Sequence, residues 1–111
     1  MRIDLHRMGS VTVLSPRGAI AQVDVDEFNG VVEEYRHKTN GRMVLEFSQV
    51  SFLDSRGVEV LWDLADRQRE AGQTTKLAAV PELCREIFEL TGIAGHLDLF
   101  DTAESAVRSF V

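Results

Sequence analysis

Residues 43–61 read MVLEFSQVSFLDSRGVEVL, and the change of pattern within this stretch decides the fold. Residues 43–47 are short and mostly apolar, which is typical of a buried strand. After residues 54–57 (DSRG) the apolar residues recur at helical spacing, and this pattern predicts a helix over residues 55–71 that Gly72 ends. The stretch is therefore a strand followed by a helix, joined by a polar segment that contains a glycine.

Turn residues divide the N-terminal part of the chain into a hairpin and a helix. Residues 3–7 and 11–14 are extended in pattern around Gly9-Ser10, which predicts a hairpin that ends where the segment PRG, residues 16–18, breaks the pattern. From Asp24 the apolar residues follow a helical period as far as Thr39, and Asp24 and Glu27 have the spacing of a capping box.

The C-terminal part is predicted to continue the alternation of strands and helices. The expected elements are a strand at residues 77–80, a helix opened by Pro81 with Leu83, Ile87 and Leu90 on one face, an edge strand at residues 97–100, and a last helix capped by Asp101 or Thr102.

This order, β-β-α-β-α-β-α-β-α, predicts an α/β fold: a mixed sheet of about five strands covered by helices. We expect the strands at residues 43–47 and 77–80 to be central. The residues expected in the core are Leu45, Phe47, Val58, Leu61, Leu64, Ile87 and Val107. Functional groups in such sheets gather at the carboxyl ends of strands, so the DSRG segment is the first place to look for a site.

Length and composition limit what kind of protein this is. With 111 residues, 44% of them hydrophobic, residues 1–111 are expected to form one domain. A formal net charge of −6 argues against nucleic-acid binding, which needs clustered Lys and Arg. No apolar run is long enough for membrane insertion. The single cysteine, Cys84, and a start unlike a signal peptide indicate a cytoplasmic protein.

The DSRG segment has a purely structural interpretation. The Ser55 hydroxyl suits a helix N-cap and would accept a hydrogen bond from the amide of Gly57 or Val58. Asp54 would favour the positive end of the helix dipole, and Gly57 would allow close packing of helix and strand. On these residues alone, the segment can be a cap and nothing more.

Catalytic interpretations lack the residues that they need. An acyl-phosphate site at Asp54, as in receiver domains, requires further carboxylates around Mg²⁺, and the hairpin end LSPR supplies none. A Ser55 nucleophile requires a histidine base, whereas His6, His37 and His96 fall in separate elements and no G-x-S-x-G motif occurs. The sequence has neither a P-loop nor metal-ligand spacing. We therefore expect a protein that is not an enzyme and has no cofactor.

A phosphorylation switch is the third interpretation. A phosphoserine adds about −1.5 to −2 charges, which the N-terminus of a helix tolerates, so that the repulsion falls on a docked partner. Three segments support this interpretation, because they resemble the STAS domain of bacterial anti-sigma factor antagonists. They are residues 44–73 (VLEFSQVSFLDSRGVEVLWDLADRQREAGQ), residues 76–93 (KLAAVPELCREIFELTGI) and residues 14–32 (LSPRGAIAQVDVDEFNGVV). Members of that family carry Asp-Ser-Ser/Thr-Gly-Leu where a helix begins.

The resemblance implies a STAS-like fold and a regulated binding protein. The unphosphorylated form would bind an anti-sigma factor, often itself a serine kinase, which would phosphorylate Ser55, and a phosphatase would reverse this. Asp54 and Gly57 match the family motif, whereas Arg56 stands where Ser or Thr is usual and Ala21 where many members have Asp. All four are expected to border the partner surface of a monomer or weak dimer. The alternative is a small STAS subunit of a lipid-transport ABC system that binds its ATPase.

The helix at residues 55–71 gives a further hint about partners. Its apolar residues spread over more than half of the circumference, which is more than one sheet face requires. Val60 and Trp62 lie near opposite margins of this apolar surface, and we expect Trp62 to contribute to a partner-binding surface.

Overall fold

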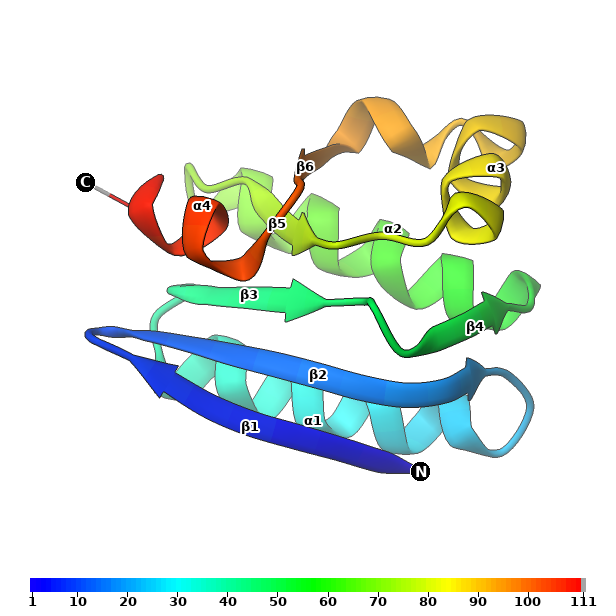
Figure 1. Ribbon diagram of the computed structural model, residues 1–111, viewed down its shortest axis with the longest axis horizontal. Helices are drawn as coiled ribbons and strands as arrows, with labels where there is room; N and C mark the ends of the chain where they lie inside the picture. The colour runs from blue at the N-terminus through cyan, green and yellow to red at the C-terminus, as the bar shows by residue number, and fades with distance from the viewer. Residues whose placement is uncertain (111) are drawn as a thin grey trace.

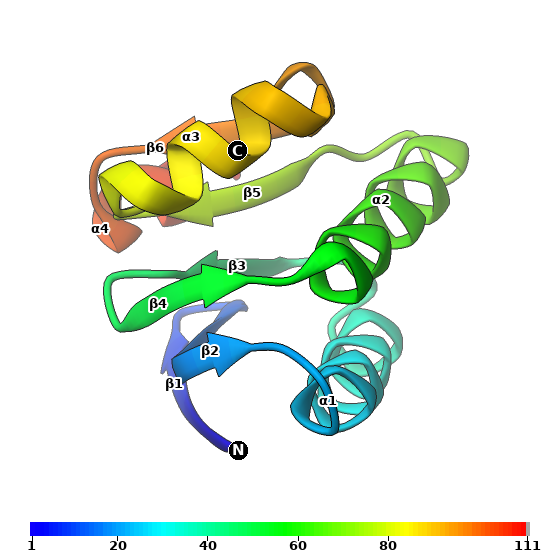
Figure 2. The ribbon, with the colours of Figure 1, turned by 90° about the vertical axis from the view of Figure 1, so that its right-hand side faces the viewer.

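The computed structural model describes residues 1–110, which form a six-stranded mixed sheet with helices on both faces (Figures 1 and 2). The elements, in chain order, are β1 (Arg2–Met8), β2 (Val11–Ile20), α1 (Asp24–Lys38), β3 (Met43–Glu46), β4 (Val50–Leu53), α2 (Ser55–Glu70), β5 (Thr75–Ala78), α3 (Glu82–Thr91), the 3₁₀ turn η1 (Ile93–His96), β6 (Leu97–Phe100) and α4 (Ala103–Arg108).

The sheet has the order β1-β2-β3-β5-β6, with β4 paired to the second half of β2. β1 is antiparallel to β2, and the other pairs are parallel. The predicted α/β class and mixed sheet are therefore confirmed, with β3 and β5 in the centre and β6 at an edge.

Each face of the sheet carries a core, because successive residues of a strand point to opposite faces. The two cores differ in size. Leu14 and Leu45 belong to the larger core, which α1, α2 and α3 cover. Their neighbours Val13 and Val44 belong to a smaller core under α4. Figure 2 shows α1 and α2 side by side on one face and α4 on the other.

The second half of the hairpin differs from the prediction. β2 continues through Pro16 and Gly18 to Ile20, and β4 is a strand that the sequence pattern did not reveal. β2 pairs with β3 only as far as Leu14 and with β4 from Gly18 onward. Pro16 lies between the part of β2 that pairs with β3 and the part that pairs with β4. On this side of β2 the sheet therefore needs no hydrogen bond from an N–H at position 16, which proline lacks.

The predicted capping box of α1 is wrong. The N-cap residue is Val23, and no side chain caps the helix. Instead, the amides of Asp24 and Val25 donate to the carbonyls of Ala21 and Gln22 at 3.1 and 3.2 Å. The chain enters α1 through a turn that satisfies these first amides with backbone oxygens, which leaves no function for a side-chain cap.

Most of the predicted core residues are buried, but α3 faces differently from the prediction. Leu45, Phe47, Val58, Leu61 and Leu64 are buried, whereas Ile87 and Val107 are only partly so. α3 buries Cys84 and Phe88, and it leaves Leu83 and Leu90 exposed. Pro81 is its N-cap residue rather than its first helical residue.

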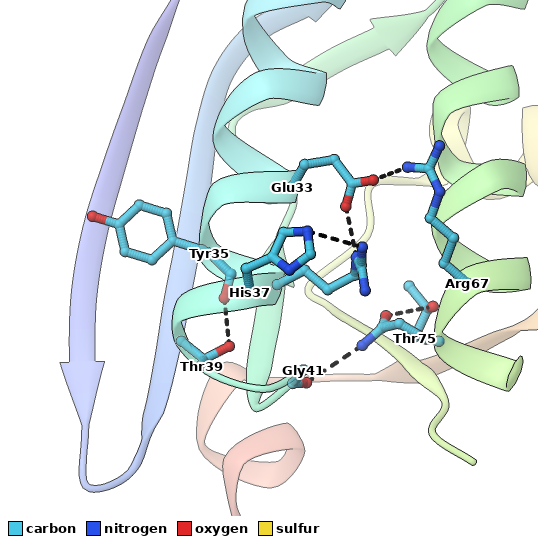
Figure 3. Close-up of polar contacts among 9 residues, drawn as sticks. Glu33, Tyr35, His37, Thr39, Gly41, Arg67 and Thr75 are labelled. Carbon is cyan, nitrogen blue, oxygen red and sulfur yellow. Dashed lines mark hydrogen bonds and ion pairs between the residues drawn. The ribbon is translucent and has the colours of Figure 1, made fainter. Parts of the chain in front are cut away.

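Polar contacts fix the C-terminal half of α2 against α1 and β5 (Figure 3). The buried Gln68 donates to the carbonyl of Gly41 at 3.3 Å, and its side-chain oxygen accepts from the Thr75 hydroxyl at 2.7 Å. Glu33 on α1 forms ion pairs with Arg36 and, across to α2, with Arg67. These contacts hold α2 in place at the end opposite to its N-terminus.

Candidate functional site

The DSRG segment lies at the end of the molecule where β2 and β4 finish and where α1 and α2 begin. Figure 2 looks onto this end and shows the start of α2 beside the loop that leads from β2 into α1. The amide of Asp54 donates to the carbonyl of Ile20 at 3.2 Å, which joins the end of β4 to the end of β2. The site is therefore at the carboxyl ends of strands, as the fold class predicted.

Asp54, and not Ser55, caps α2. Asp54 is the N-cap residue with an extended backbone, and its Oδ1 accepts from the amide of Gly57 at 2.9 Å. The assignment of the cap to Ser55 is wrong because the helix begins one residue earlier than that assignment requires, and Ser55 is its first residue. A carboxylate at the cap position also meets the positive end of the helix dipole.

The second oxygen of Asp54 links α2 to the loop before α1. Oδ2 accepts from the amide of Gln22 at 2.8 Å. The hydrogen bonds from the amides of Gln22 and Gly57, in that order of importance, lower the pKa of Asp54 because they stabilise its charged form. Gln22 has a φ of 53°, in the left-handed region that residues other than glycine seldom adopt.

Arg56 holds the same residue from its other side. Its Nη1 donates to the carbonyl of Gln22 at 3.2 Å, and its Nη2 donates to Asp26 Oδ1 on α1 at 2.9 Å. Asp54 and Arg56 thus hold the N–H and the C=O of one turn residue. Neither contact was visible in the sequence, because the partners lie 32 and 34 residues apart.

Gly57 is required by the close approach of α2 to the end of β2. A Cβ atom at this position would lie 2.5 Å from the carbonyl oxygen of Ile20 and 3.3 Å from Cβ of Leu53. Side-chain carbons essentially never come that close to a backbone oxygen, so any larger residue would push α2 away from the sheet. Gly57 is buried and contributes to the site by bringing the start of α2 against β2 and β4.

Ser55 itself is exposed, with exposed apolar side chains in the adjoining segments. Val23, next to Gln22, is 84% exposed, and Phe52 on β4 is 42% exposed. Sequence reasoning did not single out either residue, although an apolar residue just before the polar first turn of α1 was a usable signal. Ala21 is partly buried in the same turn. The structure therefore brings together Ala21, Asp54, Ser55, Arg56 and Gly57.

Trp62 lies outside this cluster. It is partly buried, and its ring packs on His96 in η1 with 4.4 Å between the ring centroids. It follows Ser55 by seven residues, which places both on the same side of α2, two turns apart. Trp62 is thus at the margin of the helix surface that begins at Ser55.

Residues 1–110 contain neither a cluster of metal ligands nor a helix suited to span a membrane. No group of three or more His, Cys, Asp or Glu side chains in that range could hold a metal ion. No helix in the described part of the chain combines the length and the apolar composition of a membrane span.

A model of the STAS domain family matches residues 2–106. The chain belongs to the STAS domain family. A relative, the candidate anti-sigma factor antagonist BtrV of Bordetella bronchiseptica, is 18% identical to this STAS domain over 110 residues, which cover 99% of this chain and 95% of BtrV.

Solved structures show the same fold. A candidate anti-sigma factor antagonist from Thermotoga maritima has a TM-score of 0.86 at 19% identity, over 96% of this chain and 92% of that one. The anti-sigma factor antagonist SpoIIAA in its unphosphorylated form has a TM-score of 0.71 at 15% identity, over 97% of this chain and 96% of that one. The Bacillus SpoIIAA structure in the phosphorylated form has a TM-score of 0.69 at 17% identity, over 99% of this chain and all of that one.

Proposed function

We propose that this STAS domain is an anti-sigma factor antagonist: a binding protein rather than an enzyme, which binds an anti-sigma factor when Ser55 is unphosphorylated. The name of BtrV and the names of the structural neighbours support this function. The anti-sigma factor would be a serine kinase, a phosphatase would reverse its action, and both would meet the protein in the cytoplasm.

The observation that carries the proposal is that Asp54, and not Ser55, caps α2. Asp54 provides the cap of α2, while Ser55 is exposed in the first turn. A phosphoryl group on Ser55 would therefore leave the capping hydrogen bond intact and would sit where the helix dipole favours an anion. The fold can accept the modification, and its effect is directed outward to whatever docks there.

The chemical step is an ordinary phosphoryl transfer. A kinase that uses ATP would form a bond between Ser55 Oγ and the γ-phosphorus, break the bond from that phosphorus to the bridging oxygen of ADP, and remove the hydroxyl proton with a base of its own. An exposed serine at the start of a helix is accessible for such a transfer.

The surroundings of Ser55 support a protein partner. The exposed Val23 and Phe52 in the adjoining segments are apolar and would provide the hydrophobic part of an interface. The partner surface would include Ala21, Asp54, Arg56 and the backbone around Gly57, with Trp62 at its margin. A phosphoserine in this surface would add about −1.5 to −2 charges that a docked partner must desolvate or repel.

The experiment that tests the function compares Ser55→Ala with Ser55→Asp. Each variant is titrated against the candidate anti-sigma factor, with Ser10→Asp at the far hairpin turn as the control for added charge. We expect Ser55→Ala to bind like the wild type and to resist the kinase. We expect Ser55→Asp to fold normally and to bind at least ten-fold more weakly, because its carboxylate approximates part of the phosphate's charge. Binding of Ser55→Asp as tight as that of Ser10→Asp would refute the switch.

A further inference from the structure

Two side chains from the start of α2 hold the turn between β2 and α1. Asp54 accepts from the amide of Gln22 at 2.8 Å, and Arg56 donates to the carbonyl of Gln22 at 3.2 Å. The φ of 53° at Gln22 is unfavourable for a residue with a side chain, and such a conformation persists where the surroundings hold it. These two contacts, together with the backbone hydrogen bonds within the turn, hold the turn that carries the exposed Val23.

The contact from Arg56 is the weaker of the two. Its guanidinium is shared between the carbonyl of Gln22 and the carboxylate of Asp26 at 2.9 Å. Both partners of this ion pair are open to solvent, with the Arg56 side chain 54% and the Asp26 side chain 80% exposed. Exposed ion pairs contribute little because water screens them, so a stronger anion close by can displace Asp26.

Phosphorylation would create such an anion on the neighbouring residue. Phosphoserine carries up to twice the charge of a carboxylate and three acceptor oxygens that match the guanidinium fork. The charged residues nearest to Ser55 along the chain are Asp54 before it, Arg56 after it and Glu59 one turn later on α2. Arg56 is the cation among these three residues, and its long side chain can turn from Asp26 on α1 toward residue 55.

We propose that Arg56 binds the phosphoryl group of phosphorylated Ser55 within the same molecule, and that it leaves Asp26 and the carbonyl of Gln22 to do so. This proposal rests on the proposed function, since it concerns the same serine. The turn at residues 21–24 then keeps the contact from Asp54 and loses the one from Arg56. The turn that carries the exposed Val23 is then held by fewer contacts, so that the modification changes the shape of the docking surface as well as its charge.

The contact can be tested without a kinase by incorporating phosphoserine at position 55 during synthesis of the full chain. The second pKa of a phosphoserine, near 6, is read from its phosphorus NMR signal during a pH titration. A bound guanidinium stabilises the dianion, so we expect this pKa to be lower by about half a pH unit in the wild-type background than in Arg56→Ser. Asp26→Asn removes the carboxylate that competes for Arg56, and this variant should lower the second pKa of the phosphoserine further. Equal values in the wild type and Arg56→Ser would overturn the proposal.

Release of the turn is tested by amide hydrogen exchange. The amides of Asp24 and Val25 donate to the carbonyls of Ala21 and Gln22, so they report on the turn directly. In the wild type, phosphoserine should accelerate their exchange several-fold, and Arg56→Ser should accelerate it similarly without phosphoserine. In the doubly changed protein the two effects should not add. Acceleration by phosphoserine that persists fully in Arg56→Ser would contradict the exchange of partners.

A matched control separates Arg56 from a general loss of charge on α2. Arg69→Ser removes another exposed ion pair of the same helix, from Arg69 to Asp66 at 3.0 Å, with no contact to the turn. It should leave both measurements unchanged. Because the phosphoserine is built in, a failure of these tests concerns Arg56 alone, whereas the absence of a kinase or of an anti-sigma partner would count against the proposed function alone.

Discussion

At the level of single residues, the site depends on Asp54, whose two carboxylate oxygens serve two different elements. One oxygen caps α2 through the amide of Gly57, and the other holds the turn before α1 through the amide of Gln22. The same hydrogen bonds lower the pKa of this carboxyl group. Asp54 is therefore the residue that joins the start of α2 to the turn before α1.

The lowered pKa of Asp54 predicts a dependence of stability on pH. The folded protein holds the pKa below the value of about 3.9 for an unfolded chain, so the stabilisation is present above that pH and is lost as the pH falls through the folded value. Asparagine also caps helices but does not titrate in this range. We expect the urea midpoint of Asp54→Asn to fall less steeply than that of the wild type between about pH 5 and pH 2. Parallel curves for the two proteins would contradict this assignment.

Gly57 makes a second prediction at this scale. In Gly57→Ala the new Cβ would meet the Ile20 carbonyl, and we expect a loss of about 1–3 kcal/mol in unfolding free energy because the packed strands can yield only slightly. Gly30→Ala, within α1, is the matched control, since a Cβ atom at position 30 would meet nothing within 4 Å. This control should gain about 0.5–1 kcal/mol from the better helix propensity of alanine. Denaturant titrations of both variants measure the difference, and equal effects would refute the close approach.

At the level of elements, α2 carries most of the connection between core and site. Its buried residues include Leu61 and Leu64, which pack in the larger core. Residues 54–57 at its start contact Ile20 at the end of β2, Leu53 of β4 and Gln22 in the turn before α1. A displacement of the buried side of α2 would therefore also displace Ser55.

A pair of leucine truncations tests how α2 and α3 are oriented. Leu61 on α2 is fully buried, and Leu61→Ala should cost about 2–5 kcal/mol because it leaves a cavity in the larger core. Leu90 on α3 is 87% exposed, and Leu90→Ala should change stability by less than about 0.5 kcal/mol. Urea unfolding measures both values. A large loss in Leu90→Ala would mean that α3 turns this side chain toward the core.

These elements also show what a sequence can predict here. α2 was predictable because its helical period and the glycine after it are local signals. The orientation of α3 was not predictable from the sequence. Leu83, Ile87 and Leu90 form a regular apolar stripe, and whether the helix buries that stripe or Cys84 and Phe88 depends on the position of β4. The site followed the same rule. The DSRG segment was visible, whereas the left-handed turn at Gln22 and its contacts to Asp54 and Arg56 depend on residues more than thirty positions apart.

At the level of the whole molecule, the sheet separates two cores that differ in strength. α1, α2 and α3 cover the larger core, and the short helix α4 covers the smaller one. The ring of Phe110 packs against the smaller core, and Arg42 Cζ and Lys76 Nζ lie 5.1 and 4.8 Å from its centroid. Figure 1 shows α4 near the end of the molecule that lies away from the start of α2.

This difference predicts that α4 opens before the rest of the protein. α4 spans six residues and buries Ala106 as its fully covered side chain, so little apolar surface opposes its detachment. Native-state hydrogen exchange in low urea should give its amides opening free energies well below the global value. The amides of Leu61 and Leu64 should exchange only through global unfolding. Because Ser55 lies on α2, phosphoserine at position 55 should leave the exchange of α4 unchanged. Equal opening free energies for α4 and α2 would mean that the two faces of the sheet unfold as one unit.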